Sequence, residues 1–253
     1  MIGQEKLYNK ILRTLPKSVV LIGDIGSGKT TLAKEIADTL NYNFIHIEEN
    51  DITTTLEIIN LSSKSHTKNL FCFEHGDKLS DQVQNALLKT LEEDTAGNIY
   101  FICSADNSRI LPTIVSRSDV YNMENYTKEQ LEYFSETRCS STSIEFCINP
   151  GDILYKKYLL DIGIYDIILD LCKNIYKNIN KANVGNIFNI VRTLEVYEFD
   201  KNLAIWVINV LIDFYRTDCN KLRLCMLYKN HISSNSTNFK RTFEQLLVGL
   251  NAQ

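Results

Sequence analysis

The sequence predicts an α/β region with a parallel sheet over about the first 123 residues and an all-helical region after it. In the first region, short apolar runs of β-prone residues alternate with segments of helical periodicity, a pattern typical of βαβ units. A glycine-rich loop follows the first apolar run and precedes a helical segment. In the second region the periodicity is helical throughout, and none of the three prolines lies beyond residue 150.

The elements of the α/β region follow in chain order. Strands are predicted at Val19–Ile22, Phe44–Ile47, Leu70–Phe73, Ile99–Cys103 and Val120–Met123. Helices are predicted at Glu5–Leu15, Thr30–Leu40, Leu56–Leu61, Ser80–Glu93, with Ser80 as N-cap, and Tyr126–Phe134. Farther on, apolar residues recur at helical spacing in four groups: Ile167, Leu171 and Ile175; Ile187, Ile190, Val191 and Leu194; Leu203, Val207 and Leu211; and Phe239, Phe243, Leu246, Leu247 and Leu250.

The glycine-rich loop, Gly23-Asp-Ile-Gly-Ser-Gly-Lys29-Thr30, matches the G-x-x-x-x-G-K-[ST] pattern. Backbone N–H groups of such a loop cradle nucleotide phosphates, the lysine reaches the β- and γ-phosphates, and the threonine hydroxyl binds Mg²⁺. The expected cofactors are therefore ATP and Mg²⁺. The candidate nucleotide-binding residues are Gly23, Gly26, Ser27, Gly28, Lys29, Thr30 and Thr31, and Thr30 is also a candidate metal ligand.

A nucleotide site of this kind needs a carboxylate at the end of a nearby strand to hold the water shell of Mg²⁺. Glu74 follows the run Leu70–Phe73 and is the candidate, although a polar pair at a strand end without chemistry is the alternative. In an ATP-hydrolysing version of this site the next residue would be a glutamate that polarises the attacking water, but here it is His75, whose imidazole is a poorer base for this task. Ser104 and Asp106 are candidates for sensing the γ-phosphate, and loop polarity explains them equally well.

The composition argues against several other classes of protein. The chain is 44% hydrophobic and has a net charge of −4, so it lacks the overall basic charge of a dedicated nucleic-acid binder. No apolar stretch is long enough for a membrane span, and the first residues lack a signal-peptide pattern. The seven cysteines form no C-x-x-C pair, which argues against a zinc site or a disulfide framework and predicts a reducing, cytoplasmic location. Cys72, Cys103 and Trp206 are expected in the core.

Three blocks of sequence resemble a known family. Glu74-His-Gly-Asp-Lys-Leu79 and the following Gln84-Asn-Ala-Leu-Leu-Lys-Thr-Leu-Glu-Glu93 are similar to the Asp-Glu-Ala-Asp-Lys-Leu and Asn-Ala-Leu-Leu-Lys-Thr-Leu-Glu-Glu runs of bacterial clamp-loader subunits. Leu111-Pro-Thr-Ile-Val-Ser-Arg117-Ser118 resembles their Leu-Pro-Thr-Ile-x-Ser-Arg-Cys segment, and Ile2-Gly-Gln-Glu5 resembles the start of the same AAA+ class. The closing residues 234–250 resemble, more faintly, the last collar helix of delta-prime subunits.

The resemblance implies an AAA+ nucleotide-binding domain at residues 1–123, a helical lid at 124–160 and a helical collar at 161–253 that joins subunits into a ring. Its implied partners are the other clamp-loader subunits, a sliding clamp and, through the assembled complex, primer–template DNA. In the family, the arginine corresponding to Arg117 reaches the ATP of a neighbouring subunit as an arginine finger. Because His75 replaces a glutamate and Asn149-Pro-Gly-Asp152 lacks the lid arginine, weak intrinsic ATPase activity is expected.

Other readings remain open. A small-molecule P-loop kinase would need several arginines around the transferred phosphoryl group, whereas this chain has eight arginines and no arginine-rich lid motif. A stand-alone AAA+ DNA-remodelling ATPase should keep the glutamate and the lid arginine. A scaffold that no longer binds nucleotide is disfavoured by the intact loop, and Arg117 alone could be a solvated surface residue.

Overall fold

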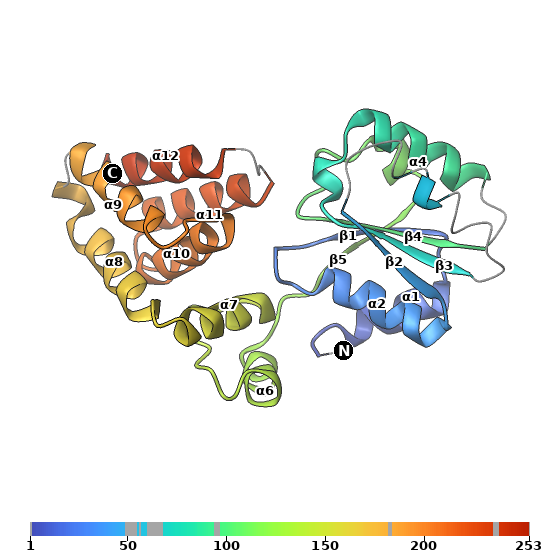
Figure 1. Cartoon of the computed structure of the whole chain (residues 1–253), viewed down its shortest axis with the longest axis horizontal. Coiled ribbons are helices and arrows are strands. Elements are labelled where there is room, and N and C mark those ends of the chain that lie inside the picture. Colours follow the sequence, from blue (N-terminus) through green and yellow to red (C-terminus); the bar gives the residue numbers. More distant parts are fainter. Residues whose placement is uncertain are drawn as a thin grey trace. The chain divides into compact units, whose positions relative to one another are not determined.

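A parallel five-stranded sheet forms the centre of the N-terminal part of the computed structural model (Figure 1). The strands lie in the order β2-β3-β4-β1-β5, and their bounds are Ser18–Ile22 for β1, Asn43–Ile47 for β2, Asn69–Phe73 for β3, Ile99–Ser104 for β4 and Asp119–Asn122 for β5. All neighbouring strands are parallel. The five predicted strands are confirmed, with ends that differ by one residue.

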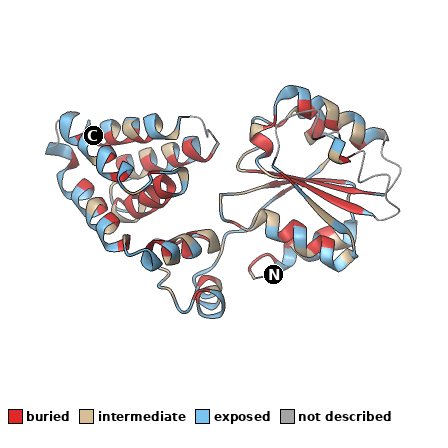
Figure 2. Ribbon diagram, viewed as in Figure 1, coloured by how far each residue is buried: buried red, intermediate tan, exposed pale blue. Residues whose placement is uncertain are grey.

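Helices cover both faces of this sheet (Figures 1 and 2). Helices α1 (Glu5–Thr14) and α2 (Lys29–Leu40) bury Leu7, Ile11, Leu32 and Ile36 against one face. Helices α4 (Asp81–Glu93) and α5 (Pro112–Val115) bury Val83, Leu87, Leu91 and Ile114 against the other. Strands covered on both sides must be apolar along their whole length, which explains their continuous hydrophobic runs.

The structure describes residues 2–48, 55, 57–59, 68–93, 97–181, 184–234 and 238–252. The helix expected at 56–61 lies partly outside these ranges, and residues 57–59 are helical. Ser80 is confirmed as the N-cap of α4, because its hydroxyl accepts a hydrogen bond from the backbone N–H of Val83 at 3.3 Å.

The chain divides into two compact units, Met1–Gln130 and Leu131–Gln253, and the second is helical as predicted. Helix α6 (Lys128–Arg138) crosses the boundary between the units. The helices that follow are α7 (Pro150–Asp161), α8 (Tyr165–Asn178), α9 (Val184–Glu195), α10 (Lys201–Phe214), α11 (Cys219–Ser234) and α12 (Phe239–Asn251), with a short 3-10 helix, η2, at Ile179–Lys181. Every residue from Leu203 to Leu211 is buried, since α10 contacts α7, α8, α11 and α12. The division into lid and collar at residues 124–160 and 161–253 stays a prediction.

Two details of the helical region differ from expectation. Helix α6 begins at Lys128 rather than Tyr126, because Thr127 and Gln130 form a capping box: the backbone N–H of Gln130 donates to the Thr127 hydroxyl at 3.3 Å, and the N–H of Thr127 donates to the Gln130 side chain at 2.9 Å. In α8 the buried face contains Ile168 and Cys172, and Ile167 is 45% exposed.

The seven cysteines are all free thiols, and Cys72, Cys103 and the indole of Trp206 are buried as expected. Within the described ranges, no helix combines the length and apolar character needed to cross a membrane.

Candidate nucleotide-binding site

Three of the predicted site segments leave the sheet at the same edge. The glycine-rich loop follows β1, Glu74 follows β3, and Ser104 ends β4. In a parallel sheet the carboxyl ends of the strands share one edge, which is where ligands bind in open α/β folds. The backbone N–H of Gly23 donates to the carbonyl of Ser104 at 3.1 Å, so the loop is fixed to the end of β4.

The loop adopts a conformation that only glycine enters easily. Gly26 and Gly28 have φ angles of 82° and 90°, in the left-handed region. A Cβ at Gly23 would lie 2.7 Å from the Met123 side chain. Helix α2 begins at Lys29, directly after Gly28, so its first backbone N–H groups lie at the end of the loop, an arrangement suited to phosphate.

Lys29 lies across the loop that precedes it. Its Nζ donates to the carbonyl oxygens of Gly23 at 2.7 Å and Asp24 at 2.8 Å. Burial lowers the pKa of Lys29, while the neighbouring Cys103 and the carboxylates of Asp24, Glu74 and Asp77 act in the opposite direction. An ammonium group that has lost part of its water shell interacts more strongly with an anion than a fully hydrated one.

Tyr126 binds the loop from outside, and Gln4 anchors the segment just before Tyr126. The Tyr126 hydroxyl donates to the carbonyl of Ser27 at 2.8 Å, and the Gln4 side chain exchanges two hydrogen bonds with the backbone of Glu124, at 2.7 and 3.0 Å. The Ser27 hydroxyl is buried without a hydrogen-bond partner among the described residues. The donor-rich loop, Lys29 and this hydroxyl fit a group of phosphate oxygens.

Glu74, the candidate for the Mg²⁺ water shell, is paired with a histidine. Its Oε2 lies 2.7 Å from Nε2 of His46 on β2, and Nδ1 of His46 lies 3.4 Å from Glu48. The register of β2 on β3 brings His46 beside Glu74. Their separation of 28 residues along the chain hides this contact from sequence reasoning.

The end of β4 forms a buried polar cluster. The Ser104 hydroxyl donates to Asp77 Oδ1 at 3.2 Å and to the backbone carbonyl of Asp106. Asp77 belongs to the 3-10 helix η1 (Gly76–Lys78), which lies so close to β4 that a Cβ at Gly76 would be 2.5 Å from Ile102. The Ser104 hydroxyl is thus engaged within the protein. Its role, and that of Asp106, in sensing a γ-phosphate stays a prediction.

Arg117 is not brought to this site. It precedes β5 by two residues, and the hydroxyl of the next residue, Ser118, lies 2.7 Å from that of Ser18 at the start of β1. Arg117 therefore stands at the amino edge of the sheet, opposite the loop. Its side chain is 43% exposed and donates to Glu92 at 2.8 Å and to the carbonyl of Thr113 at 3.0 Å.

Comparison with known proteins gives two findings. Residues 43–127 match the family model described as DNA polymerase III, delta subunit. The structure is similar to that of a DNA polymerase III gamma subunit-related protein from Thermotoga maritima, with 16% identity, 99% coverage of each chain and a TM-score of 0.55. A search of curated proteins finds no match. The chain therefore shares the fold of that structure, a parallel α/β domain followed by a helical region, and residues 43–127 resemble the family described as DNA polymerase III, delta subunit.

Proposed function

We propose that this protein is an ATP-binding subunit of a DNA polymerase III clamp loader, of the delta-prime type, that supplies an arginine to a neighbouring subunit. The observation that best supports the proposal is the placement of the phosphate-binding loop and Arg117 on opposite edges of one sheet. A chain arranged in this way can bind nucleotide at one edge and complete a second nucleotide site at the other.

At the first edge, the loop from Gly23 to Gly28 and the side chain of Lys29 would hold the phosphates of ATP. The hydroxyl of Thr30 and the carboxylate of Glu74, through water, would hold Mg²⁺, which neutralises charge on the phosphates when bound. Thr31 follows in the first turn of α2 and is exposed.

This chain is expected to bind ATP but to hydrolyse it slowly. Phosphoryl transfer to water needs a group that orients the attacking water, and the residue after Glu74 is His75 rather than a carboxylate. The backbone of His75 is left-handed, with φ 56°, because the chain turns there into η1. We therefore expect a nucleotide-dependent assembly role with little turnover by the isolated subunit.

At the second edge, Arg117 would stabilise charge on the ATP of the neighbouring subunit. Its bond to Glu92 holds the guanidinium on the surface without burying it. The proposed partners are the other loader subunits, the sliding clamp and, through the assembled complex, primer–template DNA.

The test is a reconstituted loader that carries the Arg117→Ala subunit. An arginine supplied in trans raises the rate at the site it completes by a factor of about 10³–10⁵. In the variant, DNA- and clamp-stimulated ATP turnover should therefore fall at that site. ATP binding by this chain should stay unchanged. Arg216→Ala is the matched control, because Arg216 is also exposed and paired with a carboxylate. Unchanged turnover in a complex of normal stoichiometry would show that Arg117 is a surface arginine only.

A further inference from the structure

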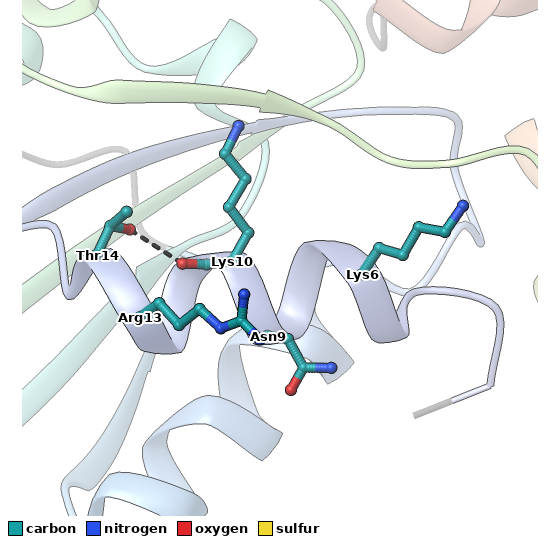
Figure 3. A pocket seen from close by; sticks show the side chains of 5 residues that line it. All are labelled: Lys6, Asn9, Lys10, Arg13 and Thr14. Carbon is teal, nitrogen blue, oxygen red and sulfur yellow. Dashed lines mark hydrogen bonds between the residues drawn. The ribbon is translucent and has the colours of Figure 1, made fainter.

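The outer face of α1 carries three exposed basic side chains, those of Lys6, Lys10 and Arg13. Lys6, Asn9, Lys10, Arg13 and Thr14 line a shallow hollow of about 400 Å³ (Figure 3). Residues at these intervals lie along one side of a helix, while the other side of α1 is buried in the core. All five are exposed, and Figure 3 shows the basic side chains distributed along successive turns.

The charges of Lys6, Lys10 and Arg13 are not compensated by ion pairs among the described residues. None of them forms an ion pair within the part of the chain that the structure describes, and Lys10 instead lies 4.9 Å from the centre of the Tyr121 ring. The nearby acidic groups are Glu5 in the first turn, Glu124 in an adjoining hollow of about 350 Å³, and Asp119, which accepts a hydrogen bond from Tyr121 at 3.1 Å. The face therefore has positive charge available in a chain whose net charge is −4.

The spacing of these cations suits a regular polyanion. With a rise of about 1.5 Å per residue, Lys6 and Lys10 are about 6 Å apart along the axis and Lys10 and Arg13 about 4.5 Å. Each strand of duplex DNA carries one phosphate per ~3.4 Å of the duplex axis, so long flexible side chains at such intervals can reach separate phosphates. Asn9 adds a hydrogen-bonding group of a kind that contacts phosphate oxygens, whereas the Thr14 hydroxyl donates to the carbonyl of Lys10 at 3.2 Å.

The polar lining favours a nucleic-acid backbone over an acidic protein segment. The described side chains that line the hollow all end in polar or charged groups, whereas Val120 and Tyr121 help to line the adjoining hollow. Protein interfaces usually derive much of their affinity from apolar or aromatic anchors, whereas sequence-independent binding of DNA is dominated by contacts between basic side chains and phosphates.

We propose that the outer face of α1 binds the phosphodiester backbone of duplex DNA without reading its sequence. The contact would be made by this chain itself, and it depends neither on bound nucleotide nor on the assembled complex. Arg13 would contribute a planar fork to a phosphate, and Lys6 and Lys10 two mobile point charges.

The experiment measures binding of the full chain to a fluorescent 20-base-pair duplex by anisotropy over a range of salt concentrations. For B-DNA, the slope of log K against log salt is about −0.9 per neutralised phosphate. The variant Lys6→Ala/Lys10→Ala/Arg13→Ala should therefore bind at least about tenfold more weakly at low salt and lose about 2 to 3 units of slope. The variant Lys6→Ala/Arg13→Ala, which keeps Lys10 on Tyr121, should lose about 2 units, and Lys6→Arg/Lys10→Arg should retain binding.

The matched control is Lys173→Ala/Arg216→Ala/Lys240→Ala, which removes the same charge from exposed residues that pair with Asp170, Asp213 and Glu195. Its salt slope should equal that of the parent. An equal loss in this control would assign binding to net charge and overturn the proposal. Tighter binding to a polyglutamate peptide than to the duplex, lost in the α1 variant, would also overturn it in favour of an acidic protein partner.

Discussion

The carboxylate of Glu74 lies 2.7 Å from Nε2 of His46, so a histidine of the neighbouring strand holds one oxygen of the candidate metal-binding carboxylate. A carboxylate fixed in this way has a second oxygen that can accept a hydrogen bond from metal-bound water. The pair links the edge strand β2 to the site, although His46 belongs to no recognised sequence motif.

His46→Ala should therefore reduce the contribution of Mg²⁺ to nucleotide affinity several-fold, because Glu74 loses the partner that orients it. Glu74→Gln should have the same effect through loss of charge. Both variants should bind ADP without Mg²⁺ as the parent does, and titration calorimetry with and without Mg²⁺ measures the difference. Equal Mg²⁺ dependence in all three proteins would exclude a role for the pair.

Lys29→Ala should weaken binding of ATP–Mg²⁺ by about ten- to a hundredfold, since a hydrogen bond to a charged group contributes about 1.5–3 kcal/mol. Lys34→Ala, an exposed lysine of the same helix, is the control and should leave affinity unchanged. If calorimetry gave Lys29→Ala and the parent the same affinity, the assignment of the phosphate site would be wrong.

The isolated chain should hydrolyse ATP barely above background, and His75→Glu should raise the rate, because a carboxylate orients water better than an imidazole does. His75→Asn is the matched control: asparagine tolerates the left-handed backbone at φ 56° but cannot act as the base. Rates are measured by phosphate release. Brisk hydrolysis by the parent that Lys29→Ala abolishes would contradict this reading of the site.

The free energy of unfolding should decrease in alkaline solution, and ionisation of the Cys225 thiol should cause part of the decrease. Burial, followed by the nearby Asp218, raises the pKa of this thiol from 9.0 to about 12. As the pH rises, the Cys225 thiol loses its proton in the unfolded chain before it does so in the folded chain. Its contribution to the free energy of unfolding is therefore complete below about pH 9 and decreases by about 1.4 kcal/mol per pH unit as the pH rises toward 12.

Urea unfolding of Cys225→Ala in reducing buffer should accordingly show a shallower loss of stability between pH 8 and 11 than the parent. The constant cost of the smaller side chain cancels when slopes are compared. Cys219→Ala, at an exposed position of the same helix, should keep the slope of the parent. Parallel slopes for the parent and Cys225→Ala would refute the prediction.

The strands and the loop were predictable because their determinants are local. A buried parallel strand must be apolar throughout, and the loop needs glycine at Gly26 and Gly28 whatever surrounds it. The helical character of the second unit was equally visible in its periodicity. The N-cap at Ser80 followed from the residue type and the helix behind it.

The contacts that complete the site were not predictable, because they join residues distant in sequence. Tyr126 was assigned to a helix, yet it lies before α6 and donates to the carbonyl of Ser27. Helix α11 also lacked an apolar signal, because two positions of its buried face are Lys221 and Lys229. The terminal nitrogen of Lys221 donates a hydrogen bond to the Asn180 side chain, so the aliphatic part of Lys221 is buried while its ammonium group keeps a polar partner.

Because the loop and Arg117 lie at opposite edges of the sheet, those two edges present different functional surfaces. An assembly in which the arginine of one chain meets the loop of the next, while that next chain's own arginine faces a third chain, joins unlike surfaces and is heterologous. Such heterologous contacts either close into a ring or continue as an open helix, and the angle between successive chains decides which. One chain at the end of an open series would then keep its Arg117 edge unused, and the chain at the other end would lack an arginine from a neighbour.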